Sequence, residues 1–147
     1  IAIIAVLKCG AAYIPIDSTY PLDRKKYMLS NARSRMAIIL GNDYKVDNSI
    51  IEFDISAFNY SDGRVEDINT SYSDNDIIYV LYTSGSTGKP KGAILRQKGV
   101  LNMLSWYTED FNIDQDDKNL IFSSFAYDLT QKNILPRKIT QLNPCTV

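Results

Sequence analysis

Hydrophobic residues in the first half of the chain fall into short segments separated by polar ones. The apolar run Ile1–Cys9 fits either a helix or a strand, and Gly10 is suited to end it as a helix cap. Apolar positions spaced over Pro21–Arg35, with Pro21 in the first turn, predict an amphipathic helix. Three shorter apolar segments predict strands: Tyr13–Ile16, Met36–Leu40 and Ile50–Phe53.

A polar connection, Ser56–Asp76, leads to the most hydrophobic segment of the second half. That segment, Ile77–Tyr82, is an unbroken β-branched and aromatic run, which predicts a strand buried on both faces in a parallel sheet. The remaining segments predict a strand at Ala93–Leu95, an amphipathic helix carrying Val100, Leu104, Tyr107 and Phe111, a strand at Leu120–Phe122, and a loop entering a helix over Phe125–Leu135. Alternating strands and helices predict an α/β fold with a mainly parallel sheet flanked by helices.

Composition and charge narrow the classes of function. Of 147 residues, 45% are hydrophobic and 22% charged, and the formal net charge of -1 gives no overall field that attracts nucleic acid or an anionic membrane. The run Ile1–Leu7 is too short for a membrane span and lacks the basic leader of a signal peptide, which favours a cytoplasmic protein. The lack of histidine excludes histidine-based catalysis in this chain, and the distant Cys9 and Cys145 predict neither a zinc site nor a disulfide framework.

The loop Thr83–Gly92 brings glycines, hydroxyls and two lysines together directly after the buried strand. Glycines let backbone N–H groups approach a ligand closely, hydroxyls donate to phosphate oxygens, and lysines supply positive charge, so the loop fits a polyphosphate. A Walker P-loop is excluded, because Gly85 and Gly88 are three positions apart instead of five and Pro90 stands where that motif has a hydroxyl. A flexible surface loop with solvated lysines is the alternative.

The segment Tyr82–Gly92 resembles, nearly residue for residue, the signature loop of the adenylate-forming (AMP-binding) superfamily. That superfamily includes acyl-CoA synthetases, luciferases and the adenylation domains of nonribosomal peptide synthetases. The resemblance implies that the loop binds the β- and γ-phosphates of ATP while a carboxylate attacks the α-phosphorus, which yields an acyl-adenylate and pyrophosphate. The residues implied to bind the nucleotide are Thr83, Ser84, Gly85, Ser86, Thr87, Gly88 and Lys89.

Two flanking segments resemble core motifs of peptide synthetase adenylation domains. Leu7–Asp17 is similar to the second motif, with Cys9 in place of the usual alanine, and its residues have structural explanations that include an ion pair between Asp17 and Arg24. Phe122–Thr130 resembles the fourth motif, which implies that Asp128 binds the α-ammonium group of the amino acid substrate. A helix N-cap is the alternative role for Asp128.

The likeness extends over residues 1–135, which we interpret as part of an adenylation domain, whereas residues 136–147 diverge from the family. It implies ATP and Mg²⁺ as cofactors and phosphopantetheine on a partner carrier domain. The implied partners are the peptidyl carrier and condensation domains of a larger synthetase, with neither nucleic acid nor membrane. The family's magnesium ligand, ribose-binding aspartate and catalytic lysine would all lie downstream, so we predict no catalytic and no metal-binding residue within these 147 residues.

Two other functions fit the same residues. A general acyl-CoA synthetase of the superfamily would carry the same loop, and Asp128 would then be incidental. A non-catalytic remnant with weak nucleotide binding is the third hypothesis.

We predict that the isolated 147-residue chain shows no amino-acid-dependent exchange of pyrophosphate into ATP, because it encodes no counterpart of the family's ribose, magnesium and lysine motifs. The measurement is an ATP–pyrophosphate exchange assay on the purified chain. Robust exchange would refute the prediction.

Overall fold

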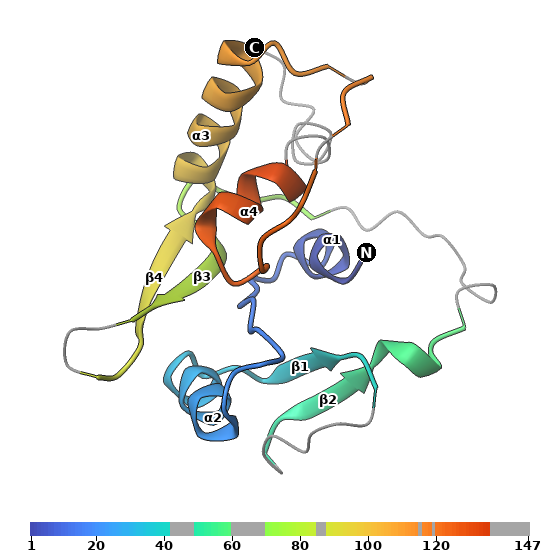
Figure 1. The fold of residues 1–147 in the computed structure, drawn as a ribbon, viewed down its shortest axis with the longest axis vertical. Coiled ribbons are helices and arrows are strands. Elements are labelled where there is room, and N and C mark those ends of the chain that lie inside the picture. The colour runs from blue at the N-terminus through green and yellow to red at the C-terminus, as the bar shows by residue number, and fades with distance from the viewer. Residues whose placement is uncertain (42–48, 60–69, 85–87, 115, 119, 136–147) are drawn as a thin grey trace.

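The computed structural model describes residues 1–41, 49–59, 70–84, 88–114, 116–118 and 120–135. Helix α3 extends from the end of β4, α1 and α4 lie at the centre, and α2 lies with β1 and β2 (Figure 1). The elements in chain order are α1 (Ala2–Lys8), α2 (Leu22–Asn31), β1 (Met36–Ile39), β2 (Ile51–Asp54), the 3-10 helix η1 (Ile55–Ala57), β3 (Ile77–Thr83), β4 (Lys91–Arg96), α3 (Gln97–Asp110) and α4 (Asp128–Ile134). This mixture of helices and strands confirms the predicted α/β class.

Three helices end on a residue in the left-handed conformation. Gly10 follows α1 with φ +74°, and its N–H donates to the carbonyl oxygen of Leu7, so the ambiguous first segment is a helix and Gly10 caps it. Arg33 after α2 and Asn112 after α3 take the same conformation, with φ values of 53° and 48°. At each helix end, the N–H of this residue and the N–H of the next residue donate to carbonyl oxygens of the last turn, which the helix itself leaves free.

The strands pair in both directions. β1 and β2 form a parallel pair, whereas β3 pairs with β4 in an antiparallel ladder. The parallel neighbour expected for β3 is reduced to one bridge between Tyr13 and Tyr79, and the strand predicted over Tyr13–Ile16 is limited to that bridge. β3 and β4 are antiparallel because residues 84–90, which connect them, are long enough for a hairpin but too short for the crossover that parallel strands need.

Two other predictions about local structure are corrected. Leu120–Phe122 does not form a strand; its residues are exposed, Phe122 at 88%, and they pair with no strand in the part of the chain that the structure describes. Pro21 occupies the N-cap position of α2 instead of its first turn. Residues 60–69 of the predicted polar connection lie outside the described residues.

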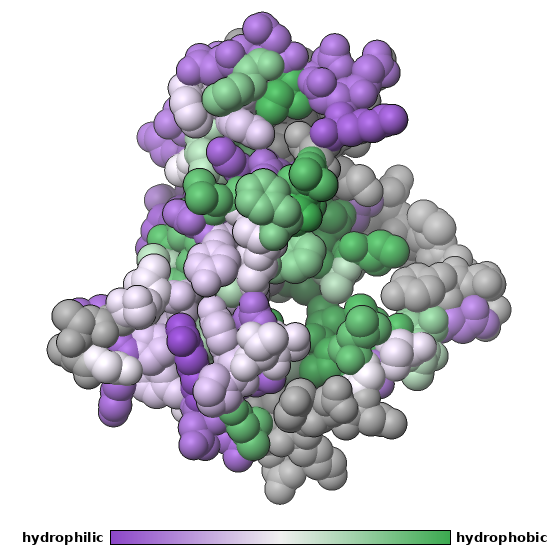
Figure 2. Space-filling model, viewed as in Figure 1, coloured by the Kyte–Doolittle hydropathy of each residue, from purple (hydrophilic) through white to green (hydrophobic). Residues whose placement is uncertain are grey.

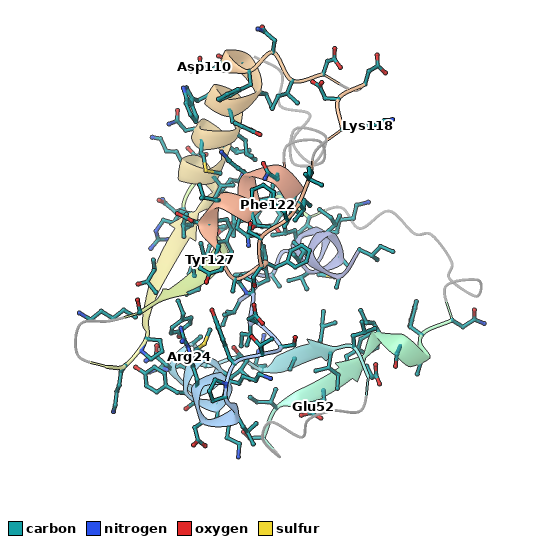
Figure 3. All side chains as sticks on the ribbon, in the orientation of Figure 1. Arg24, Glu52, Asp110, Lys118, Phe122 and Tyr127 are labelled. Carbon is teal, nitrogen blue, oxygen red and sulfur yellow. The ribbon has the colours of Figure 1, made fainter. Side chains whose placement is uncertain are left out.

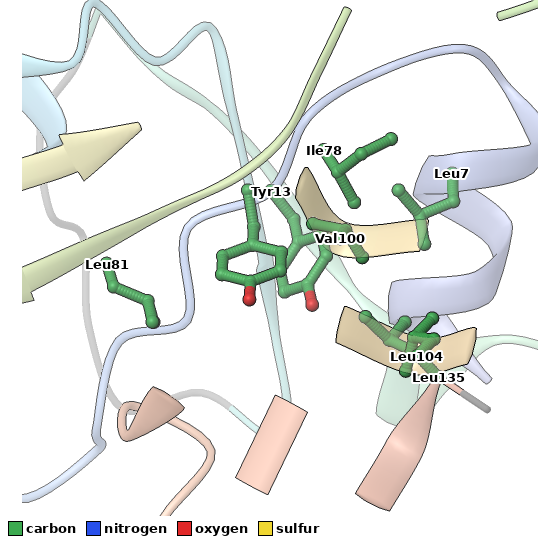
Figure 4. Packing of buried hydrophobic residues seen from close by; sticks show 8 residues of the cluster. Leu7, Tyr13, Ile78, Leu81, Val100, Leu104 and Leu135 are labelled. Carbon is green, nitrogen blue, oxygen red and sulfur yellow. The ribbon is translucent and has the colours of Figure 1, made fainter. Parts of the chain in front are cut away.

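The hydrophobic core gathers around β3. Figure 4 shows Leu7 from α1 and Val100 and Leu104 from α3 beside Ile78 and Tyr13. The fully assembled cluster consists of Leu7, Tyr13, Ile78, Tyr79, Leu81, Val100, Leu104 and Leu135. Residues from helices α1 and α3 and from the segments after α1 and α4 therefore depend on one strand for their burial. No helix of the described segments has the length and apolar composition needed to cross a bilayer.

Figure 2 shows hydrophobic side chains at the surface over β1 and around α4. On the β1–β2 pair, the register places Met36 opposite Ile51 and Ile38 opposite Phe53, so these four exposed side chains share one face. Around α4, the exposed apolar residues are Leu120, Ile121, Phe122, Phe125, Tyr127 and Leu129. Surfaces of this kind are typical of contacts with another protein segment.

Gly92 in β4 lies where side chains of the paired strand β3 leave little room for a Cβ atom. A Cβ atom at Gly92 would lie 3.1 Å from Val80 Cγ1 and 3.2 Å from the Cζ of Tyr82, its partner in the ladder. The tyrosine ring has little freedom to yield, because its hydroxyl donates to the carbonyl oxygen of Met28 at 3.1 Å and lies 2.8 Å from Asn31 Oδ1. The buried tyrosine thus fills the space of the missing side chain and ties α2 to β3.

We predict that Gly92→Ala lowers the free energy of unfolding by about 1 kcal/mol or more through overpacking. Gly99→Ala is the matched control: Gly99 lies in α3, and a Cβ atom added there would meet nothing within 4 Å, so alanine should raise stability by about 0.5–1 kcal/mol. Urea denaturation of both variants measures the difference. Equal effects of the two substitutions would contradict the close packing inferred at Gly92.

Candidate functional site

The predicted phosphate loop joins β3 to β4 and is exposed where the structure describes it. Thr83 ends β3 and Ser84 follows it, both exposed. The central residues Gly85, Ser86 and Thr87 lie outside the described residues. Gly88 and Lys89 are exposed as the chain returns toward β4, and Lys89 Nζ lies 5.9 Å from the centre of the Tyr27 ring on α2.

The strands hold both ends of this loop close together. Thr83 pairs with Lys91 across the antiparallel ladder, and the next pair is Tyr82 with Gly92. Tyr82 is buried, and burial is the main cause that raises its pKa, with Tyr27 adding to the effect. Its hydroxyl therefore stays protonated, and the base of the loop is anchored to α2.

Gly88 has a backbone conformation and a free space that suit close approach of a ligand. Its φ of +80° lies in the left-handed region, and a Cβ atom would meet nothing within 4 Å. An anion could therefore approach the backbone here without a side chain in its way. Exposed hydroxyls at Thr83 and Ser84 and the Lys89 ammonium group supply hydrogen-bond donors and positive charge around the same loop.

Asp128 begins α4 and presents its carboxylate to solvent. Tyr127 holds the N-cap position with extended backbone angles, and no side chain caps this helix. Asp128 Oδ1 accepts from the N–H of the next residue, Leu129, at 2.7 Å, whereas the side chain of an N-cap residue accepts from the N–H two or three residues further on. The N-cap alternative is therefore wrong, and Asp128 is a first-turn residue whose carboxylate is available to a ligand.

Tyr79 lies close enough to Asp128 for their charges to interact. Burial raises the pKa of Tyr79 to about 12, and the negative charge of Asp128 contributes to the rise. Thr83 lies four positions after Tyr79 along β3, which corresponds to roughly 13 Å of strand. Asp128, at the start of α4, thus acts electrostatically on the strand that leads into the predicted phosphate loop.

Side chains that the sequence did not identify support the turn before Asp128. Thr130 Oγ1 donates to the carbonyl oxygen of Ser124 at 2.9 Å, and Gln131 Nε2 donates to the carbonyl oxygen of Phe125. Figure 3 labels Tyr127 in this turn, at the start of α4. Nothing in the hydrophobic pattern signals these bonds, because a threonine and a glutamine inside a short amphipathic helix are ordinary polar residues.

Asp17 has a different partner from the one predicted. Its carboxylate accepts a hydrogen bond from Ser124 Oγ and two from Thr19, the backbone N–H at 2.9 Å and the hydroxyl at 2.7 Å. The bond from Ser124, followed by those from Thr19, lowers the pKa of Asp17 to about 2. The Arg24 guanidinium lies 4.1 Å from the centre of the Tyr20 ring, and no ion pair joins it to Asp17 in the described structure.

No group of three or more acidic, histidine or cysteine side chains suited to a metal ion occurs among the described residues. Cys9 is a free, exposed thiol, and Cys145 lies outside the described part.

Sequence comparison relates the chain to large peptide synthetases. It is 34% identical to bacitracin synthase 1 of Bacillus licheniformis over 140 residues, which is 92% of this chain and 3% of that protein. The chain therefore spans only a small part of the length of this curated relative.

Solved structures of a peptide synthetase and of a CoA synthetase share the fold of this chain. The nonribosomal peptide synthetase FmoA3 in its AMPPNP-bound form superimposes with a TM-score of 0.81 at 22% identity, over 92% of this chain and 14% of that one. The o-succinylbenzoate CoA synthetase of Bacillus subtilis, in complex with an acyl-adenylate intermediate, gives a TM-score of 0.76 at 17% identity, over 92% of this chain and 36% of that one. At these identities the likeness shows the fold alone.

The profile of the family described as AMP-binding enzyme matches residues 1–136. This match covers both the loop after β3 and the turn leading into α4. The chain therefore belongs to the AMP-binding enzyme family.

Proposed function

We propose that the chain is part of an ATP-dependent enzyme that activates an amino acid as its aminoacyl-adenylate, with release of pyrophosphate, for nonribosomal peptide synthesis. The observation that carries the proposal is that the exposed carboxylate of Asp128 adds to burial in raising the pKa of Tyr79 in β3, the strand that leads into the phosphate-type loop. An amino acid lying between Asp128 and this loop would meet Asp128 with its ammonium group and the nucleotide with its carboxylate.

The loop supports the nucleotide half of this proposal. We assign the β- and γ-phosphates of ATP to Thr83, Ser84, Gly85, Ser86, Thr87, Gly88 and Lys89. The open space at Gly88 and the exposed Lys89 ammonium suit a triphosphate, whose negative charges need donors at short range. The synthetase FmoA3, with which the chain shares its fold, has been solved with the ATP analogue AMPPNP.

The substrate half rests on Asp128 and on the relatives. A carboxylate that binds an ammonium group away from water disfavours a fatty acid, which would leave the carboxylate without a partner. Relatives at 31–36% identity are peptide synthetases by name. An acyl-CoA synthetase is the second candidate, since CoA ligases share the fold, and an inactive remnant is the third. Pyrophosphate exchange by the full-length protein with amino acids against fatty acids separates them.

The proposal includes further components that the described residues do not themselves contain. ATP would be used with Mg²⁺, whose protein ligand is expected elsewhere in the domain, and the product would be passed to phosphopantetheine on a carrier domain. Peptidyl carrier and condensation domains of a larger synthetase would be its partners in the cytoplasm. We further propose residues 1–135 as the adenylation part, with 136–147 as a divergent end.

We predict that Gly88→Val, in the full-length enzyme, raises the KM for ATP by about tenfold or more, because a branched side chain fills the space through which phosphate approaches. Lys89→Ala should have a smaller effect, since it removes one exposed charge and leaves the space open. Gly41→Val is the matched control: Gly41 also has a positive φ, +87°, and nothing within 4 Å of a Cβ, so it suffers the same backbone strain away from the loop. An unchanged KM for ATP in Gly88→Val would contradict the phosphate assignment.

We predict that Asp128→Ala, in the full-length enzyme, lowers kcat/KM for the native amino acid by about a hundredfold or more, because losing one member of a charge pair that the rest of the pocket shields from water costs about 3 kcal/mol or more. The KM for ATP should barely change, and the ratio of kcat/KM for the native amino acid to that for its des-amino analogue should fall. Adenylation kinetics with both substrates measure this.

Asp23→Ala is the control for a structural role of Asp128. Asp23 is also an acidic residue in the first turn of a helix, so its loss removes a comparable interaction with the helix dipole, worth about 0.3–1 kcal/mol. If the two alanine variants behave alike and the preference for the amine survives in both, Asp128 is structural and the amino-acid assignment fails.

A further inference from the structure

The turn before α4 is fixed by two side chains that are themselves fully buried. Thr130 and Gln131 have no exposed surface. Each donates from its side chain to a backbone carbonyl six residues earlier, Thr130 to Ser124 and Gln131 to Phe125. These bonds lie outside the helix's own ladder, so they set the path by which the chain enters α4.

The same turn is also tied to the segment that follows α1. The hydroxyl of Tyr13 donates to Gln131 Oε1, and Ser124 Oγ donates to Asp17 Oδ2. Burial raises the pKa of Tyr13, so its hydroxyl remains a donor. Two hydrogen bonds thus connect segments that are more than 100 residues apart in sequence.

An apolar side chain at position 131 would fill the core without the cost of burying an amide. Gln131 instead uses both ends of its amide, Oε1 toward Tyr13 and Nε2 toward Phe125. Such a bridge fixes orientation, because its hydrogen bonds are satisfied in one arrangement only.

Asp128 depends on this bridge through the helix that they share. It begins α4 and lies about one turn before Gln131. Its charge is felt by Tyr79, whose ring packs against that of Tyr13 with centres 5.5 Å apart. A change in the bridge would therefore move the start of α4 relative to the strand beneath it.

We propose that Tyr13 and Gln131 are positioning residues for amine recognition, with the Asp17–Ser124 bond as a second tie. Their bridge sets the direction from which the Asp128 carboxylate meets the ammonium group of the substrate. This role rests on the proposed function of Asp128.

The test uses the full-length enzyme and the variants Gln131→Met and Tyr13→Phe. Gln131→Met keeps the volume and removes both bonds, so the KM for the native amino acid should rise about tenfold, as a small displacement of a binding group does, while the KM for ATP stays constant. The preference over the des-amino analogue should narrow by a similar factor. Tyr13→Phe should change the KM for the amino acid and the substrate preference in the same direction but by a smaller factor. The effects of the two substitutions should be less than additive in the double variant, because both residues act through one bridge.

Tyr72→Phe is the matched control. It removes the hydroxyl of a different tyrosine, which donates to the backbone carbonyl oxygen of Leu7 in α1 and makes no bond to α4 in the described structure. It should lower stability comparably without changing the preference for the amine. If Gln131→Met does not fold, Tyr13→Phe and Ser124→Ala carry the test.

The outcomes separate this proposal from the proposed function. If Asp128→Ala removes the amine preference and the bridge variants leave both KM values as Tyr72→Phe does, the positioning role is overturned and the proposed function stands. If Asp128→Ala itself leaves the preference intact, the proposed function fails, and the positioning role fails with it.

Discussion

Strand β3 can be stable only when both of its faces are covered, because six of its seven residues are hydrophobic. One face receives Tyr13 against Tyr79, and the other holds Tyr82 against the end of α2. Helix α3 adds Val100 and Leu104 to the same core. Burial ends at Thr83, and the described loop residues on both sides of the gap, Ser84 and Gly88–Lys89, are exposed.

Much of the fold follows from local patterns in the sequence. Apolar positions at helical spacing signalled the helix over residues 97–110, and short runs of apolar residues signalled the strands at 36–39, 51–54 and 77–83. The direction of pairing was harder to predict. An apolar run such as Ile77–Tyr82 indicates burial but not which strand covers it, and the short connection to β4 decides for an antiparallel ladder. The strand predicted over Leu120–Phe122 was wrong because a hydrophobic run forms a strand only where another strand lies beside it.

The candidate site divides in the same way. The loop residues could be selected from the sequence, because their chemistry is carried by residue types in consecutive positions, and Asp128 was selected by the resemblance of Phe122–Thr130 to a family motif. Gln131 and the partner of Asp17 could not, since each depends on a contact between distant segments. Asp17 illustrates the difficulty: opposite charge seven positions away suggested Arg24, whereas the fold supplied a serine 107 residues on.

The separation of these partners has a consequence for the order in which the parts are made. During synthesis β3 and β4 pair residues that are close in sequence, and α3, which packs on β3, follows directly, so these three elements can assemble before α4 is made. The bridge from Tyr13 to Gln131 closes across 118 residues and has to await the arrival of α4, so until then the first segments stay without their final contacts. A ribosome pausing before α4 would therefore hold a nascent chain in which β3 and β4 are paired and the segment that carries Asp128 is not yet present.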